Sequence, residues 1–251
     1  MKILIVGGCF TCQHNIEFNR LYHQTILHKF IKSGLSCAQI QTISYERIAK
    51  TIDKIETIHK DYKFDLLIFH LRAEPLMRMV KLYYKYLNDE GKLCHSLNLP
   101  FFRNLNAEKY DLLEVRRIIN SVKNQDETQL HHSLRELNYY LGSIIGNKRR
   151  AMKSYAKFTE KIAVFCKNNS SDFLLLGPVS RPFSRFENKL SYEMSIKFNE
   201  FSKSENIKYL ELLGESTLGN NPMFFPNGQH VSQEGHDEIA MKIYEKIKCF
   251  P

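Results

Sequence analysis

The sequence predicts an α/β protein, a three-layer α/β/α sandwich built on a mainly parallel, five-stranded sheet. Short, nearly continuous apolar runs have the length and composition of buried parallel strands. Segments with helical spacing of apolar residues separate these runs, and such alternation is typical of a doubly wound sheet with right-handed crossovers. A length of 251 residues suits one domain over residues 1–251.

The five expected strands differ in how strongly they are indicated. Four are clear apolar runs, and the fifth, nearest the C-terminus, is less strongly indicated. In chain order they are Lys2–Val6, Cys37–Ile43, Asp65–Leu71, Asp172–Leu176 and Ile207–Leu212.

Helices are expected between the strands and after the last one. An apolar stripe runs from Ile16 to Phe30, and Gly34 is placed to end that helix. A shorter helix is expected from Ile48 to about His59. The last helix should run from Ser232 to Lys248, with Ser232 as its N-cap but without the glutamate that completes a capping box.

The segment of about residues 76–150 interrupts the alternation of strand and helix. Its patterns are helical over Met77–Leu87, Asp111–Val122 and Leu130–Leu141, and it contains no convincing strand. We interpret it as a helical insertion, followed by a long helix that ends near Asn168.

Composition indicates an ordinary globular chain, with 43% apolar and 25% charged residues. No segment approaches the roughly 20 uninterrupted apolar residues that a membrane span requires. The first apolar run, Met1–Gly8, is too short for a signal peptide and lacks a cleavage site, so a cytoplasmic location is expected. The six cysteines are too sparse and irregular for a disulfide framework.

The net charge of +9 favours acidic partners, which include phosphate-bearing substrates, an acidic carrier protein and nucleic acid. Basic residues gather at Lys148–Arg150 and around Arg78, Lys81 and Lys85. A solvated, lysine-rich surface would give the same pattern. Tyr83–Tyr86 alternates aromatic residues with a lysine, but at helical spacing this favours a packed face, so nucleic acid is not the expected partner.

Candidate functional residues follow the strands, because ligands bind at the carboxyl ends of the strands in open α/β sheets. Cys9 follows the first strand, Ser44 the second and Arg72 the third. Arg181 follows the fourth, and His230 lies in a polar segment before the last helix.

The order of these segments resembles the SGNH (GDSL-like) hydrolases. That family begins with a strand ending in Gly-Asp-Ser, and Gly7-Gly8-Cys9 is similar. It ends with Asp-x-x-His and often a later Gly-His, and here Asn227-Gly228-Gln229-His230 precedes Gly235-His236. Asp65–Leu71 and Leu174–Pro178 resemble two further strands of the family. The resemblance spans nearly the whole chain and implies a flavodoxin-like sandwich with a hydrolase site.

The sequence also departs from the family pattern. Cys9 stands where the family has its serine, and Asn227 stands where it has an aspartate. The asparagine that donates to the oxyanion would fall on Glu74, and no glycine follows the second strand.

The first two departures are chemically compatible. A serine nucleophile needs a histidine strengthened by a buried carboxylate, whereas a thiol near an imidazole forms a thiolate more readily. Such a pair needs its histidine oriented but not further charged, and asparagine does this in papain-like enzymes. Cys9, His230 and Asn227 are therefore predicted to form a Cys-His-Asn site. His236 is expected to be structural.

The remaining candidate residues would bind the oxyanion or substrate. The backbone N–H of Cys9 in the Gly8–Cys9 turn, together with Arg72, would supply donors. Glu74 would repel an oxyanion, and could instead pair with Arg72 or bind a substrate amine. Ser44 and Arg181 complete the predicted substrate-binding residues, and Arg185 is a further phosphate candidate.

The expected activity is acyl transfer, or hydrolysis of an ester or thioester, through an acyl group on Cys9. No bound cofactor or metal is expected, and an acyl thioester of coenzyme A or of an acyl carrier protein is the expected co-substrate. The alternative is a non-catalytic SGNH-like module that binds an acidic ligand or glycan.

Two other interpretations of Cys9 are less favoured. Cys9 and Cys12 form a C-x-x-C pattern of the redox type, but without the usual surroundings. Cys9, Cys12 and His14 lack a second ligand pair for zinc.

Overall fold

The computed structural model describes residues 1–7, 20–34, 38–44, 48–72, 140, 148–181, 185–213, 224 and 231–248. The chain divides into two compact units, one formed by Met1–Leu76 with Arg149–Pro251 and the other by Met77–Lys148. The sheet and its covering helices belong to the first unit. Of the predicted insertion at 76–150, the structure describes only Tyr140 and residues 148–150, which begin the long helix. The single-domain interpretation therefore stays a prediction.

The described strands form a five-stranded sheet in the order β2-β1-β3-β4-β5. Their bounds are β1 Lys2–Gly7, β2 Gln39–Ser44, β3 Leu66–His70, β4 Asp172–Leu176 and β5 Lys208–Leu210. Every neighbouring pair is parallel. The predicted parallel α/β architecture is therefore confirmed.

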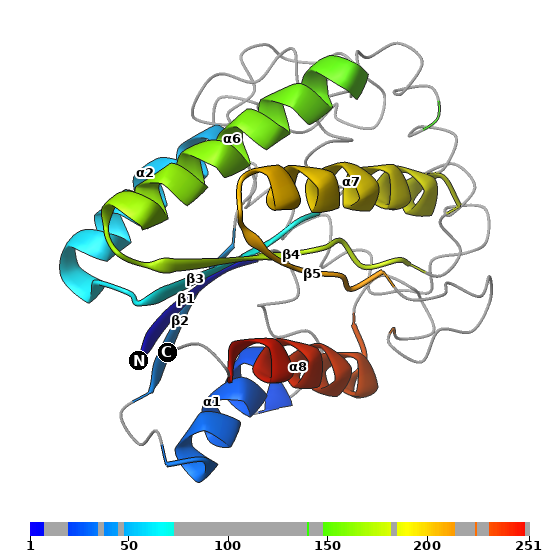
Figure 1. Ribbon diagram of the computed structural model, residues 1–251. Coiled ribbons are helices and arrows are strands. Elements are labelled where there is room, and N and C mark those ends of the chain that lie inside the picture. The colour runs from blue at the N-terminus through cyan, green and yellow to red at the C-terminus, as the bar shows by residue number, and fades with distance from the viewer. Residues whose placement is uncertain are drawn as a thin grey trace, which may run out of the picture. The chain divides into compact units, whose positions relative to one another are not determined.

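Helices cover both faces of this sheet (Figure 1). The described helices are α1 Tyr22–Lys32, α2 Ile48–Tyr62, α6 Lys148–Asn168, α7 Arg185–Ser204 and α8 Gln233–Ile247. Helices α2, α6 and α7 lie on one face, and α1 and α8 lie side by side on the other. Tyr155 of α6 links the first group, because its ring packs edge-on against Phe69 of β3 and Phe198 of α7.

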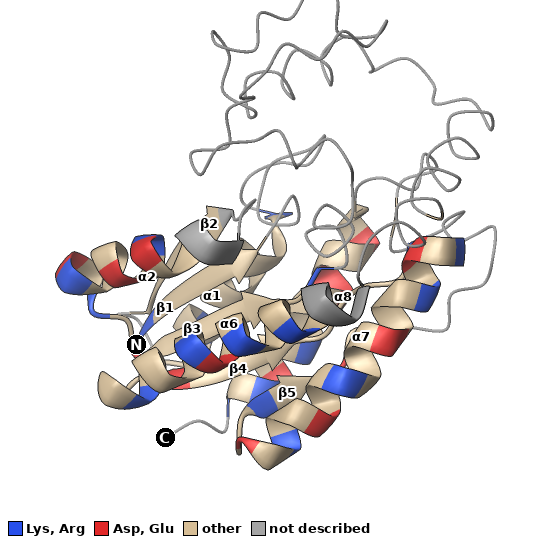
Figure 2. Ribbon diagram, turned by 90° about the horizontal axis from the view of Figure 1, so that it is seen from above, with Lys and Arg blue, Asp and Glu red and all other residues tan. Residues whose placement is uncertain are grey.

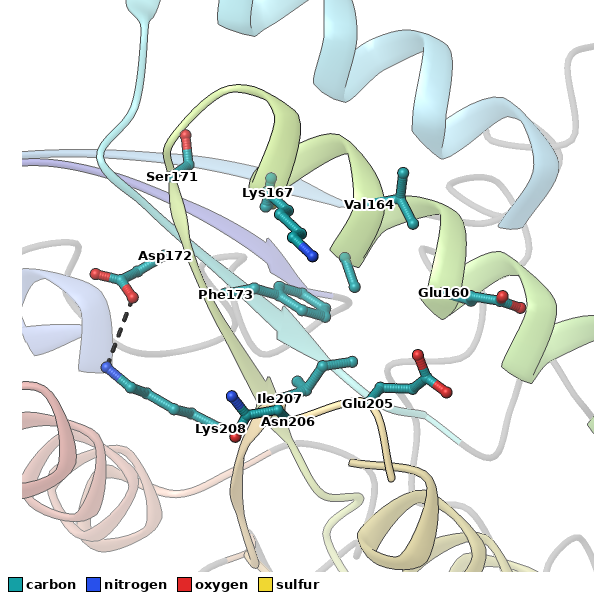
Figure 3. A pocket seen from close by; sticks show the side chains of 12 residues that line it. Glu160, Val164, Lys167, Ser171, Asp172, Phe173, Glu205, Asn206, Ile207 and Lys208 are labelled. Carbon is teal, nitrogen blue, oxygen red and sulfur yellow. Dashed lines mark ion pairs between the residues drawn. The ribbon is translucent and has the colours of Figure 1, made fainter. Parts of the chain in front are cut away.

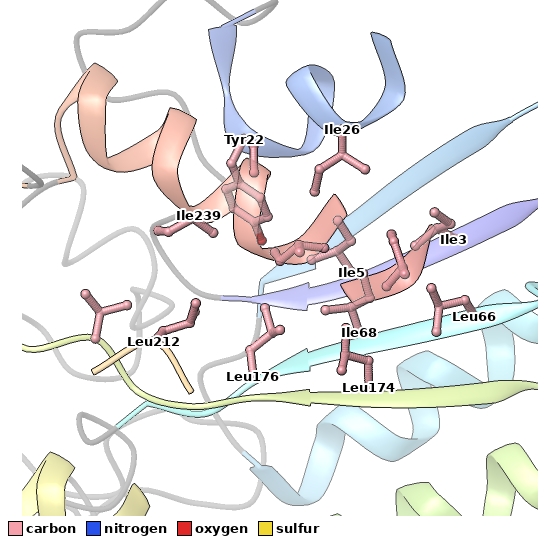
Figure 4. Close-up of a cluster of buried hydrophobic side chains, with 14 of the residues drawn as sticks. Ile3, Ile5, Tyr22, Ile26, Leu66, Ile68, Leu174, Leu176, Leu212 and Ile239 are labelled. Carbon is pink, nitrogen blue, oxygen red and sulfur yellow. The ribbon is translucent and has the colours of Figure 1, made fainter. Parts of the chain in front are cut away.

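The central strands are buried on both faces, which explains why their sequences are continuously apolar. Ile3 and Ile5 of β1 face α1 and α8, where they join Ile26 and Ile239 in the main core cluster (Figure 4). Successive residues of a strand point to opposite faces, so the buried Leu4 and Val6 face the side covered by α2, α6 and α7. Burial of this core is the main force that holds the sandwich together.

Predicted and observed element bounds agree closely where the apolar pattern is strong. The fourth strand is found at the predicted residues, and the last helix begins after Ser232, whose hydroxyl accepts a hydrogen bond from Gly235 N–H at 3.1 Å. Gly34 follows the C-cap of α1, Ser33, with φ +95°, as its predicted role in ending the helix requires. In the part of the chain that the structure describes, no helix combines the length and apolarity needed to cross a bilayer.

Three turns between a helix and the next strand use a non-glycine residue with positive φ. These residues are Lys63 (φ 45°), Ser170 (φ 54°) and Asn206 (φ 54°). Side chains other than asparagine are strained in this region, whereas glycine is not.

We expect Lys63→Gly and Ser170→Gly each to stabilise the fold by about 0.5–1 kcal/mol, because relief of strain outweighs the added freedom of the unfolded chain. Asn206→Gly is the matched control and should change stability little, since asparagine tolerates this conformation. Urea denaturation of the three variants measures the effect. Equal shifts in all three would show that backbone strain is not its cause.

Candidate functional site

The carboxyl ends of the strands lie level along one edge of the sheet. Gly7 at the end of β1 is in register with Ser44 at the end of β2, and His70 of β3 is in register with Leu176 of β4. Gly177 N–H donates to Leu210 O at 2.8 Å, which aligns β5 with them. Of the predicted site residues, Ser44 is the last residue of β2, whereas Arg72 lies two residues after β3 and Arg181 five residues after β4.

Most of the predicted site residues lie outside the described residues. They are Gly8, Cys9, Glu74, Asn227 and His230. What the structure describes is the chain that flanks them. Gly7 precedes Cys9, and Val231 follows His230.

The chain segments that flank Cys9 and His230 in sequence meet where α1 and α8 begin. The backbone N–H of Tyr22, in the first turn of α1, donates to Nδ1 of His236 at 3.2 Å. The two rings also stack, with centroids 5.9 Å apart. Gln233 of α8 adds a hydrogen bond from its Nε2 to Arg20 O at 3.1 Å. His236 therefore has the structural role predicted for it, since it accepts from one of the N–H groups that a helix start leaves without an intrahelical partner.

A short antiparallel bridge joins Phe224 to Val231. Both side chains are buried in the core beneath the sheet, together with Ile239. Residues 225–230, which include Asn227 and His230, lie between the two bridging residues in sequence. The ends of this segment are therefore anchored to the core and to the N-cap of α8.

Arg72 leaves the end of β3 half-buried, and its backbone N–H donates to the Tyr155 hydroxyl at 3.3 Å. The fully buried His70 precedes it by two residues. The pKa of His70 is lowered to about 3, chiefly by burial and also by the positive charge of Arg72, while a hydrogen bond with the Gly177 backbone acts in the opposite direction. His70 is therefore neutral at physiological pH and serves as a core residue beneath the strand ends.

Arg181 forms a buried ion pair rather than projecting from the end of β4. Its Nε donates to Glu187 Oε1 at 3.2 Å, and the two side chains are 14% and 6% exposed. The amide of Asn188 also clamps the Arg181 backbone, through hydrogen bonds of 2.7 Å to its N–H and its carbonyl. The predicted substrate contact of Arg181 stays a prediction, and the geometry assigns this arginine a role in holding α7 to the end of β4.

A cluster at the end of β5 was missed by the sequence reasoning. Glu211 accepts hydrogen bonds from the hydroxyls of Ser195 and Tyr209 and, at 2.8 Å, from the backbone N–H of Leu213. The two hydroxyls lie 2.9 Å apart, and burial raises the pKa of Tyr209. The predicted strand ran to Leu212 and so placed Glu211 inside it. A strand that ended two residues earlier would have identified Glu211 as a strand-end residue.

Gly177 makes room for this cluster. A Cβ atom at Gly177 would lie 2.6 Å from the Tyr209 hydroxyl and 2.9 Å from Glu211 Oε1. We expect Gly177→Ala to lower the free energy of unfolding by about 1–3 kcal/mol, as over-packing does. Adding Tyr209→Phe removes the nearest clashing atom and should recover part of this loss. Denaturation of both single variants and the double variant measures the coupling, and strict additivity would contradict the explanation.

Among the comparisons with known proteins, only the solved structures bear on the architecture. No protein-family model matches the sequence, and no curated protein matches it. Solved structures do match. A psychrotrophic esterase from Pseudoalteromonas sp. is 10% identical with a TM-score of 0.58, covering 98% of this chain and 96% of its own.

Two further solved structures have similar statistics. A lipolytic protein of the G-D-S-L family from Desulfitobacterium hafniense is 8% identical with a TM-score of 0.56, covering 98% of each chain. A GDSL-like lipase from Bacteroides thetaiotaomicron is 10% identical with a TM-score of 0.53, covering 98% of this chain and 87% of its own. The chain has the SGNH-hydrolase fold.

The SGNH-hydrolase fold of this chain also contains a cavity away from the predicted site. It has a volume of about 390 Å³ and lies at the amino ends of β4 and β5, where Lys208 pairs with Asp172 at 3.6 Å (Figure 3). The predicted site belongs to the opposite edge of the sheet. Within the described ranges, no three His, Cys, Asp or Glu side chains converge as metal ligands.

Proposed function

We propose that this chain transfers or hydrolyses acyl groups through a covalent thioester on Cys9. The SGNH-hydrolase fold supports this proposal, because the similar solved structures include an esterase and lipolytic proteins. The observation that carries it is the junction of α1 and α8. At this junction Tyr22 of α1 is hydrogen-bonded to His236 of α8. Helix α1 is the described helix that follows Cys9 in sequence, and α8 is the one that follows His230.

In the proposed reaction, His230 takes the thiol proton and the Cys9 thiolate attacks the acyl carbon. Asn227 orients the imidazole, and the backbone N–H of Cys9 and the Arg72 side chain hold the oxyanion. Collapse of the tetrahedral intermediate breaks the bond to the leaving group, which takes the proton from His230. Water or an acceptor then loses a proton to His230, attacks the thioester and releases the thiolate.

The proposed acyl donor is a thioester of coenzyme A or of an acidic carrier protein. A thiol nucleophile exchanges readily with another thioester, and helix α6 provides a basic surface (Figure 2). The described basic side chains of α6, Lys153, Lys157, Lys161 and Lys167, are exposed, and Glu160 is the acidic residue among them. Its Tyr155 hydroxyl accepts from Arg72 N–H, so this helix reaches the carboxyl edge of the sheet.

Turnover of acetyl-coenzyme A, acetyl-pantetheine and p-nitrophenyl acetate tests the proposal. We expect all three to be hydrolysed by the wild-type protein, and Cys9→Ala to lower kcat/KM by about 10³-fold or more. The coenzyme A thioester should be preferred over the pantetheine thioester, and more strongly at low salt, because its phosphates are attracted to the basic surface. Binding of these compounds without turnover would favour the non-catalytic module instead.

A further inference from the structure

The cluster of Ser195, Tyr209 and Glu211 occupies the point where the chain leaves β5 and enters the segment that ends at α8. Ser195 belongs to α7 and Tyr209 to β5, and Glu211 directly follows β5. Ser195 is 4% exposed, so the α7 end of the cluster is fixed in the core. The carboxylate of Glu211 is the shared acceptor of the cluster.

Glu211 also fixes the local backbone direction. Its Oε1 accepts from Leu213 N–H at 2.8 Å, which forms a tight side-chain turn two residues long. Its Oε2 accepts from both hydroxyls. One carboxylate thus ties the outgoing chain to α7 and to the last strand, and hydrogen bonds to a charged acceptor are stronger than those between neutral groups.

The surrounding residues leave little freedom for this arrangement. Gly177, at the end of the neighbouring strand β4, has no Cβ, and one placed there would clash with both Tyr209 and Glu211. Leu212, which follows Glu211, is 1% exposed and belongs to the main core cluster. The chain is therefore held on both sides of Glu211 as it leaves the sheet.

The far end of the same chain segment is held as well, by the Phe224–Val231 bridge and the N-cap of α8. Asn227 and His230 therefore lie in sequence between Glu211 at one end and Val231 at the other. A histidine that activates a thiol must be held within hydrogen-bond reach of it, and a misplacement of 1 Å can lower the rate about 10²-fold.

We propose that Glu211 is a positioning residue for the site, which fixes the start of the segment that carries Asn227 and His230. This inference rests on the proposed function, because it assumes that His230 acts on Cys9. Glu211 itself does not touch the substrate. Its role is to hold the backbone in place where the segment begins. In this chain Asn227 stands at the position where the SGNH hydrolases have an aspartate.

Glu211→Gln is the decisive variant, because the amide keeps one acceptor oxygen and replaces the other with a donor that cannot accept from Ser195 and Tyr209. Glu205→Gln is the matched control, an exposed carboxylate near the end of α7 that lies outside the cluster. Glu211→Asp tests whether a shorter carboxylate rescues the effect. Thermal unfolding of each variant first confirms that it is folded.

Two measurements separate positioning from mere stability. Hydrogen–deuterium exchange of the peptides covering 212–230 should rise at least about fivefold in Glu211→Gln, and peptides from β1 and β3 should not change. The alkylation rate of Cys9 by iodoacetamide, followed from pH 5 to 9, should fall about tenfold near pH 7 and approach the wild-type rate at high pH. Glu205→Gln should match the wild-type protein in both.

Unchanged exchange over 212–230, or raised exchange with wild-type alkylation, would overturn the positioning role. The proposed function is judged separately by the wild-type protein. If its Cys9 reacts no faster than a free thiol across the pH range, the Cys-His site is wrong, whatever Glu211 does to the exchange of 212–230.

Discussion

Cys9→Ser is expected to lower kcat/KM for thioester hydrolysis by about 10³–10⁴-fold, and Asn227→Asp is expected to restore part of that activity. A serine hydroxyl is a poor nucleophile unless its histidine base is supported by a carboxylate, and loss of that carboxylate in a serine hydrolase has an effect of this size. In the proposed site, Asn227 would orient the histidine for a thiolate but would not strengthen it as the base of a serine. The two positions should therefore be strongly coupled.

The full cycle of wild type, Cys9→Ser, Asn227→Asp and the double variant measures that coupling. We expect Asn227→Asp alone to change kcat/KM by less than about tenfold, and the double variant to exceed Cys9→Ser by about 10-fold to 100-fold. Independent effects at the two positions would contradict a shared site. Circular dichroism of each variant excludes loss of the fold as the cause.

Stability should fall steeply as the pH drops below about 6.5, because two buried histidines must stay neutral in the folded state. Burial lowers the pKa of His23 to about 4 and that of His70 to about 3, from an ordinary value of 6.5. Between these values and 6.5 the unfolded chain binds protons that the folded chain does not. The free energy of unfolding therefore rises with pH in this window and levels off above it.

Each histidine contributes a slope of about 1.4 kcal/mol per pH unit, so a shift from pH 6.5 to 4.5 lowers stability by up to about 5 kcal/mol. Urea denaturation over pH 4.5–8 measures the slope. His23→Gln and His70→Gln should each remove about half of it, whereas His28→Gln, at an exposed side chain on the same helix as His23, should not. A flat profile in the wild-type protein would show that these rings are charged or solvated.

The strands could be predicted where burial is complete. β4 was predicted at its observed residues, and β3 within one residue at each end, because both are covered by helices and read as continuous apolar runs. β5 is an edge strand with partly exposed residues, so its apolar pattern is weak. The prediction extended it to Leu212 and thereby concealed Glu211, which turns the chain out of the sheet.

The pairing of distant segments could be predicted only in outline. The parallel, flavodoxin-like sandwich follows from the resemblance and from general rules of α/β folds, but the contact between Tyr22 and His236 has no local sequence signal. Arg181 looked like a substrate residue because it follows a strand. Its actual partner, Glu187, lies in the first turn of the next helix, where a buried carboxylate is visible only in three dimensions.

The central claim is that Cys9 carries the acyl group during turnover. The most direct measurement is the intact mass of the protein quenched in acid during steady-state turnover of acetyl-coenzyme A, with peptide mapping of the adduct. We predict one added acetyl group on the peptide that contains Cys9, its loss on treatment with hydroxylamine, and no such adduct in Cys9→Ala. An unmodified protein during active turnover, or the same adduct in Cys9→Ala, would contradict the account.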